Sequence, residues 1–123
     1  MYNVSIMSIL NLSTRFSHLT PSVASSGIIQ LLRQTPDLNR LYIGQTTNPE
    51  TRIKQHISKF QIPYMTILYT TKCMCNAGQM EHLLIKQAMR EFGPVMLNKS
   101  DSSRGLVYGK PWYHVYLCHD ITL

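Results

Sequence analysis

The stretch that decides the fold reads Leu41-Tyr42-Ile43-Gly44-Gln45-Thr46. Its aromatic and β-branched residues predict a strand over 41–45. Gly44 lets the backbone pass close to a neighbouring element as the strand ends. Asn48 and Pro49 follow and predict a helix start, because asparagine caps free backbone amides and proline is tolerated in the first helical turn.

The helix that begins there is predicted to run to about Lys59. It carries Arg52 and His56 four residues apart, so both side chains share one helix face. Pro63 ends it, and the β-branched and aromatic residues 64–71 predict a further strand.

Apolar residues 27–34 contain no breaker after Gly27, and we expect a strand that pairs antiparallel with residues 41–45. Asn76 and Gln79 resemble a capping box, which predicts a second helix that Gly93 and Pro94 terminate. Further extended structure is expected over 106–108 and 112–117, with a polar loop over 99–105 before it.

Taken in order, these features resemble the GIY-YIG nucleases, with residues 42–44 as the second motif. The resemblance covers about residues 27–100 and implies a small α/β domain, in which helices flank a central antiparallel sheet of about three strands. Residues 1–26 then form an N-terminal arm that we expect to be poorly ordered. Residues 101–123 form an extension that closes the same domain.

The resemblance also implies roles for individual residues. Glu81 corresponds to the single metal-binding carboxylate, and Arg52 to the arginine that grips the scissile phosphate. His56 corresponds to a proton relay or phosphate contact, and Tyr42 lines the site near the attacking water. Asn98 corresponds to an asparagine that braces the active site. The remaining correspondences are the backbone glycines Gly27 and Gly44.

The chemistry fits these residue types. One hard cation, Mg²⁺ or Mn²⁺, on one carboxylate can polarise a phosphate and neutralise a leaving oxygen. A planar guanidinium suits two phosphate oxygens. Taken singly, each residue also has an ordinary structural explanation, such as a helix-dipole partner or a turn former. Their order along the chain favours the functional interpretation.

One residue departs from the family pattern. The first motif reads Gly27-Ile28-Ile29, where the resemblance implies a tyrosine at the third position, and isoleucine cannot take or relay a proton. The general base is then Tyr42 with a lowered pKa, or His56 with a pKa ordinarily near neutrality. Two functions follow: an endonuclease that leaves 5′-phosphate and 3′-hydroxyl ends, or a catalytically impaired nucleic-acid-binding module with the same fold.

The net charge of +6 over 123 residues favours a polyanionic partner, and with the resemblance this partner is DNA. The lysines expected to contact the phosphate backbone are Lys54, Lys59, Lys72 and Lys99. The chain has no room for a separate DNA-binding module, so a separate targeting partner is also expected. No stretch approaches the roughly 20 apolar residues of a membrane span, and no membrane partner is expected.

Three cysteines cannot all pair with one another, which indicates a reducing intracellular location. Residues 1–36 contain no acid and are rich in serine and threonine, so an organellar location is a weaker alternative. Cys73 and Cys75 lack the spacing typical of a zinc site, and we expect none.

Overall fold

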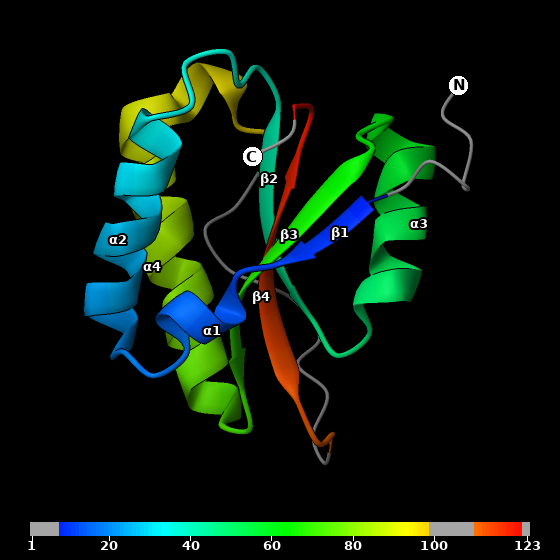
Figure 1. Ribbon diagram of the computed structural model, residues 1–123. Coiled ribbons are helices and arrows are strands. Elements are labelled where there is room, and N and C mark those ends of the chain that lie inside the picture. Colours follow the sequence, from blue (N-terminus) through cyan, green and yellow to red (C-terminus); the bar gives the residue numbers. More distant parts are fainter. Residues whose placement is uncertain (1–7, 99–109, 122–123) are drawn as a thin grey trace.

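The computed structural model describes residues 8–98 and 110–121 and shows an α/β domain (Figure 1). Its elements in chain order are β1 (Ser8–Asn11), α1 (Ser13–Phe16), α2 (Pro21–Arg33), β2 (Leu41–Thr46), α3 (Pro49–Phe60), β3 (Tyr64–Thr71), α4 (Met74–Phe92), the 3₁₀ turn η2 (Gly93–Val95) and β4 (Tyr113–His119). No helix within the described residues has the length and hydropathy needed to cross a membrane.

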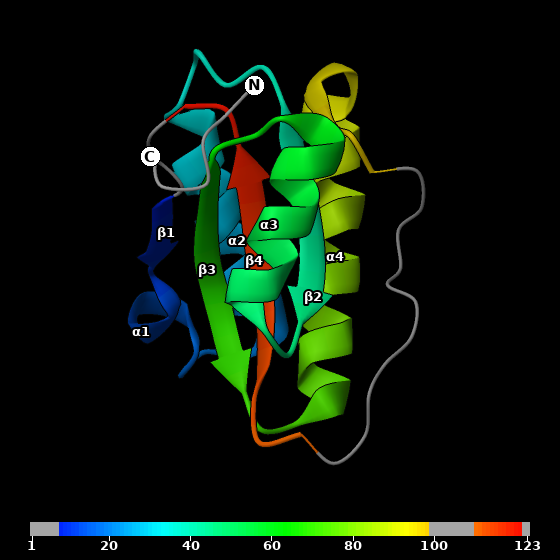
Figure 2. The ribbon, with the colours of Figure 1, turned by 90° about the vertical axis from the view of Figure 1, so that its right-hand side faces the viewer.

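The four strands form one sheet in the order β1-β3-β4-β2. β4 pairs antiparallel with both β2 and β3, and β1 adds to the edge of β3 in parallel. The expected antiparallel arrangement of about three strands is therefore present, and β1 makes the sheet larger and mixed. Helices α2 and α4 cover one face of the sheet and α3 covers the other (Figures 1 and 2).

The strand predicted over residues 27–34 is wrong, because these residues belong to helix α2 and the turn that follows it. Ala24, Ile28 and Leu32 recur every four residues, and all three are buried against the sheet side of the molecule. A short apolar run does not distinguish a buried strand from a buried helix, and here Pro21 in the first turn starts a helix.

The antiparallel neighbour of β2 is instead β4, which comes from the other end of the described chain. Leu41 pairs with His119, and Gly44 pairs with Tyr116. The sequence predicts extended structure over 112–117 as a closing element, whereas the structure places β4 between β2 and β3. The predicted strand over 106–108 and loop over 99–105 lie outside the described residues.

Residues 8–26 are part of the fold, which differs from the poorly ordered arm expected over 1–26. β1 pairs with β3, and the Leu12 amide donates a hydrogen bond of 2.8 Å to the Ile67 carbonyl. Phe16 is buried and packs beside Gly27 of α2. These contacts add apolar burial and backbone pairing that composition alone does not reveal. Residues 1–7 lie outside the described part.

The middle of the chain agrees with the predictions from its local patterns. The side chain of Asn48 accepts a hydrogen bond from the Thr51 amide at 3.2 Å and caps α3, and β3 has the predicted bounds. Helix α4 starts two residues earlier than the predicted capping box at Asn76, with Cys73 as a cap that makes no side-chain bond. The turn η2 follows α4 where Gly93 and Pro94 predict its end.

Candidate active site

Strand β2 presents Tyr42 and Gly44 toward helix α3, because alternate residues of a strand face the same side of the sheet. Gly44 lies opposite Tyr116 of β4. A Cβ at position 44 would lie 2.6 Å from Cζ of Tyr116 and would overlap its hydroxyl oxygen. The glycine of the second motif therefore makes room for the hydroxyl group of a tyrosine from another strand.

His56 reaches the same place from α3. Its Nε2 lies 2.7 Å from the Tyr116 hydroxyl oxygen, and both side chains are buried. The Tyr42 ring stands 4.5 Å from the imidazole centroid, and the Phe60 ring 5.5 Å from it. The Nδ1 atom of His56 has no hydrogen-bond partner among the described residues. One ring nitrogen is thus fixed, and the other is buried without a partner.

Two charged residues, Glu81 and Arg52, influence the pKa values of the Tyr42 and Tyr116 hydroxyl groups, in addition to the larger influence of burial. Glu81 of α4 is 3% exposed, and its carboxylate raises the pKa values of Tyr42 and Tyr116. Arg52 of α3 lowers both. The structure therefore brings Glu81 and Arg52, which approach from opposite faces of the sheet, within electrostatic range of the same pair of tyrosines.

Burial is the largest influence on how the site titrates. It raises the pKa values of Tyr42 and Tyr116, so both phenols stay protonated at neutral pH. Burial, with repulsion from Arg52 and Lys59, lowers the pKa of His56 to about 4. Imidazole is therefore neutral at pH 7 and can accept a proton. The sequence offers two candidate bases, and the pKa shifts favour His56, because the raised pKa of Tyr42 keeps its hydroxyl group protonated.

Asn98 clamps the free edge of β2. Its side chain accepts a hydrogen bond of 3.0 Å from the Ile43 amide and donates one of 2.8 Å to the Ile43 carbonyl. The Leu97 amide adds a bond of 2.7 Å to the Leu41 carbonyl. An edge strand otherwise leaves such groups unpaired, so Asn98 fixes the backbone between Tyr42 and Gly44.

The residues of the first motif lie elsewhere. Gly27 is in α2 beside Phe16, and Ile29 is buried in the apolar cluster that α2 and α4 form with the sheet. Neither takes part in the contacts around His56. The isoleucine at position 29 is a core residue of a helix, and the expected backbone role of Gly27 in a motif strand is not fulfilled.

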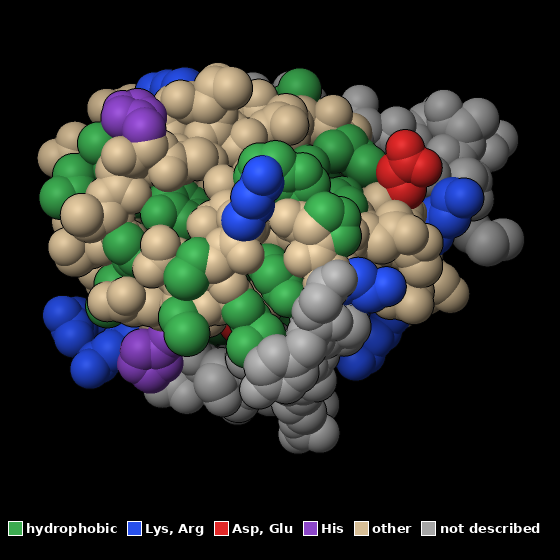
Figure 3. Space-filling model, turned by 90° about the horizontal axis from the view of Figure 1, so that it is seen from below, with side chains coloured by type: hydrophobic (Ala, Val, Ile, Leu, Met, Phe, Trp, Pro, Cys, Tyr) green, Lys and Arg blue, Asp and Glu red, His purple; other side chains and the backbone are tan. Residues whose placement is uncertain are grey.

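The predicted DNA-contacting lysines are dispersed. Lys54, Lys59 and Lys72 are exposed, whereas Lys99 lies outside the described residues. Lys59 stands 5.1 Å from the Phe60 ring, and Lys72 stands 5.1 Å from the Trp112 ring. On the face seen in Figure 3, basic side chains lie at several separate places, with apolar and uncharged side chains between them. Among the predicted lysines that the structure describes, Lys59 is the one whose charge lowers the pKa of His56.

Metal binding at this site would depend on oxygen donors. Within residues 8–98 and 110–121, no group of three or more His, Cys, Asp or Glu side chains could hold a metal ion. A single buried carboxylate is nevertheless a donor set that suits Mg²⁺, which keeps most of its waters and takes further oxygens from a phosphate. Cys73 and Cys75 are exposed free thiols.

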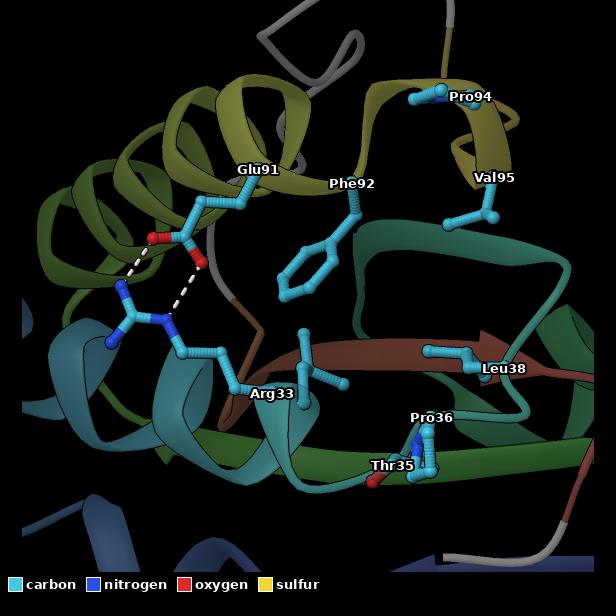
Figure 4. Close-up of a pocket in the computed structure, with 9 residues that line it drawn as sticks. Arg33, Thr35, Pro36, Leu38, Glu91, Phe92, Pro94 and Val95 are labelled. Atoms are coloured by element: carbon cyan, nitrogen blue, oxygen red, sulfur yellow. Dashed lines mark hydrogen bonds and ion pairs between the residues drawn. The ribbon is translucent and has the colours of Figure 1, made fainter.

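A pocket of about 300 Å³ lies apart from these residues, between the ends of α2 and α4 and the turn η2 (Figure 4). Arg33 and Glu91 form a salt bridge at its rim, with Arg33 Nε 2.9 Å from a Glu91 oxygen. Leu38, Phe92 and Val95 supply apolar walls. None of the residues that surround His56 lines this pocket.

The sequence analysis missed one residue at the site and one unpartnered buried group on β2. Tyr116 is flanked by Val115 and Leu117, and this aliphatic–tyrosine–aliphatic pattern is a local signal that resembles the one around Tyr42. Gln45 has a buried side-chain oxygen without a hydrogen-bond partner among the described residues, and nothing in its sequence context indicates this.

A family model described as the GIY-YIG catalytic domain matches residues 28–88. The match includes β2, α3, β3 and most of α4, and with them Tyr42, Arg52, His56 and Glu81. It does not reach β4. Searches of curated proteins and of solved structures find no match. By its match to the family model and its α/β fold, the chain belongs to the GIY-YIG family, a family of nucleases.

Proposed function

We propose that the protein is a metal-dependent endonuclease that hydrolyses phosphodiester bonds of DNA and leaves 5′-phosphate and 3′-hydroxyl ends. One observation carries the proposal. The Tyr42 ring lies 4.5 Å from the buried imidazole of His56, Arg52 stands one turn earlier on the same helix, and Glu81 is buried on α4. A carboxylate, a guanidinium and a proton acceptor are the groups that phosphodiester hydrolysis requires.

Arg52 would bind the scissile phosphate, because a guanidinium can donate two parallel hydrogen bonds to phosphate oxygens. Arg52 lies on α3 one turn before His56, so a phosphate bound to Arg52 would lie beside the imidazole. The negative charge of the phosphate would offset the repulsion from Arg52 and Lys59 that lowers the pKa of His56. Substrate binding would thereby make His56 a stronger base.

His56 would accept the proton of the attacking water at Nδ1, the buried ring nitrogen without a partner among the described residues, once substrate binding admits that water. Tyr42 would stay protonated and donate a hydrogen bond to the water or to a phosphate oxygen, because its pKa is raised. Asn98 would keep β2, and therefore Tyr42, in place. These are roles that positioned side chains perform in proton transfer and orientation.

Glu81 would hold a divalent cation, Mg²⁺ or Mn²⁺. When bound, the cation supplies charge neutralisation for the phosphate and the leaving oxygen. The donor set fits a cation that needs one or two carboxylates and retains water. Burial of Glu81 on α4 fixes its carboxylate relative to the sheet.

The proposed substrate is DNA, contacted through the phosphate backbone by Lys54, Lys59, Lys72 and Lys99 without base recognition. Because the described lysines come from separate elements, with Lys54 and Lys59 on α3 and Lys72 after β3, we also propose that a separate partner supplies targeting. The three free thiols support an intracellular location, in which they stay reduced.

Nicking of supercoiled plasmid with Mg²⁺ or Mn²⁺ tests the proposal. Wild type should nick, whereas Glu81→Gln and Arg52→Ala should each lose about 100-fold or more in rate. Glu91→Gln and Arg33→Ala are matched controls, because they remove the same charges at the remote salt bridge and should nick normally.

Ligation of the nicked plasmid tests which chemical groups the cleavage leaves at the DNA ends. DNA ligase should reseal the nicked plasmid without prior treatment, since it requires a 5′-phosphate and a 3′-hydroxyl. Nicking that survives in Glu81→Gln would contradict the proposal. Absence of nicking in all variants, with DNA still retarded in a gel at low salt, would instead assign the catalytically impaired binding module.

A further inference from the structure

Strand β4 occupies the place beside β2 that the first-motif strand was expected to fill. Gly44 and Tyr116 are paired in the β2–β4 register, and Tyr116 also pairs with Ile67 of β3. Tyr116 is fully buried in the middle of the sheet. A tyrosine therefore lies next to the second motif, although it comes from outside residues 28–88.

The hydroxyl group of Tyr116 is directed at the candidate site. It lies 2.7 Å from Nε2 of His56, and the missing side chain at Gly44 leaves the space it occupies. The Tyr116 ring stacks on the Tyr42 ring at 6.4 Å. A phenylalanine would fill the apolar part of this position equally well. The hydroxyl is useful here because it holds His56, and a buried phenol needs such a partner.

We propose that Tyr116 is a positioning residue of the nuclease reaction, which fixes His56 through Nε2 and so supplies the tyrosine that position 29 lacks. This inference rests on the proposed function. Position 29 cannot take this part, because Ile29 is buried in the cluster between α2, α4 and the sheet.

The hydrogen bond also selects a tautomer. If Nε2–H donates to the Tyr116 oxygen, Nδ1 carries a lone pair and can accept a proton. The attacking water then loses one proton to Nδ1 while its oxygen forms a bond to phosphorus. The bond between phosphorus and O3′ breaks, and O3′ takes a proton from solvent. The resulting imidazolium keeps its Nε2–H bond to Tyr116, so the ring does not have to turn.

The experiment compares wild type, Tyr116→Phe and Tyr69→Phe. Tyr69 is the matched control, because it is a buried tyrosine of the same sheet whose hydroxyl donates a hydrogen bond of 3.0 Å to the Leu19 carbonyl, away from His56. Tyr116→Phe should lower kcat for plasmid nicking about 100-fold and leave KM within about twofold, because Arg52 still binds the phosphate. Tyr69→Phe should nick at the wild-type rate.

Nitrogen-15 NMR of the histidine rings supplies a readout that a purely structural role would not change. In wild type at pH 7, His56 should carry its proton on Nε2, and Tyr116→Phe should convert it to a mixture of tautomers, whereas Tyr69→Phe should not. Wild-type nicking in Tyr116→Phe, or a His56 protonated on Nδ1 in wild type, would overturn the inference.

The two proposals fail in different ways. If wild type does not nick, or if Glu81→Gln nicks normally, the proposed function fails, and the NMR comparison still decides whether Tyr116 fixes His56. If Tyr116→Phe does not fold, 3-fluorotyrosine at position 116 keeps the shape and the hydroxyl group but makes the phenol more acidic. A several-fold change in kcat at position 116 and none at position 69 would support the inference, and equal rates would overturn it.

Discussion

The two faces of the sheet differ in the size of their apolar clusters and in the polar groups buried there. Under α2 and α4 lies a large cluster of apolar and aromatic side chains, such as Ile28 and Leu32. Under α3 the cluster is smaller, and it includes Tyr116 with buried His56 beside it. Apolar burial is the main source of folding free energy. One face therefore supplies most of the stability, which allows the other to contain a polar pair.

The largest expected effect on stability comes from removing a buried isoleucine, and its effect on nicking should differ between the two faces of the sheet. Ile28→Ala, under α2, should lower the free energy of unfolding by about 3 kcal/mol and leave the nicking rate per folded molecule unchanged. Ile53→Ala should lower stability by a similar amount, since Ile53 is also fully buried. Ile53→Ala should also reduce nicking, because Ile53 lies on α3 between Arg52 and His56. Urea unfolding and plasmid nicking measure both quantities, and equal loss of nicking in the two variants would contradict the division.

A smaller loss of stability is expected at Gly44, where the backbone of β2 makes room for the hydrogen-bonded pair of Tyr116 and His56. Gly44→Ala should lower stability by about 2 kcal/mol through overpacking, and should lower nicking by displacing the Tyr116 hydroxyl from His56. Gly78→Ala on α4 is the control, since a Cβ there meets nothing within 4 Å. In a helix this change should stabilise by about 0.5 to 1 kcal/mol. If Gly44→Ala nicks like Gly78→Ala, the close approach of Tyr116 has no functional importance.

An effect on stability of similar size to that of Gly44→Ala is expected in acid. His56 has a pKa of about 4 in the folded protein, below its ordinary value of 6.5, because burial, Arg52 and Lys59 disfavour its charged form. The unfolded chain takes up this proton first as the pH falls. The associated stability is thus fully present above pH 6.5 and is lost progressively toward pH 4, by about 2 kcal/mol once solvent screening is allowed for.

Urea unfolding of wild type and His56→Asn across this pH range measures the effect. From pH 6.5 to 4, the free energy of unfolding of wild type should fall by that amount more than the free energy of unfolding of His56→Asn. Burial also lowers the pKa values of His114 and His119, so His56→Asn should keep part of the slope. Parallel curves would show that His56 does not titrate as the structure indicates.

The sequence predicts those parts of the fold whose pattern is local. Strand β2, helix α3 and strand β3 follow from an aromatic–β-branched stretch, an Asn-Pro helix start and a second such stretch. The roles that the resemblance implies for Glu81 and Arg52 stay predictions. Residues 27–34 are assigned wrongly because a short apolar run has no period that decides between strand and helix.

The contribution of Tyr116 could not be predicted from local pattern alone. Its role depends on which strand lies beside β2, and strand order is set by packing between segments far apart in the chain. Likewise, the N-cap of α4 is Cys73 rather than Asn76, and Cys73 makes no side-chain capping bond that the sequence could signal. Contacts of this kind become visible only when the sheet is assembled.

The central position of β4 has a consequence for how the protein is made. A ribosome completes β2, α3, β3 and α4 before β4, yet β2 and β3 are neighbours only through β4. β1 and β3 can pair before β4 is made, but β2 joins the sheet only through β4. Pairings between such distant segments form slowly. His56 has no Tyr116 to hold it until then. If His56 acts as proposed, a nascent chain gains the complete site only after synthesis has passed β4.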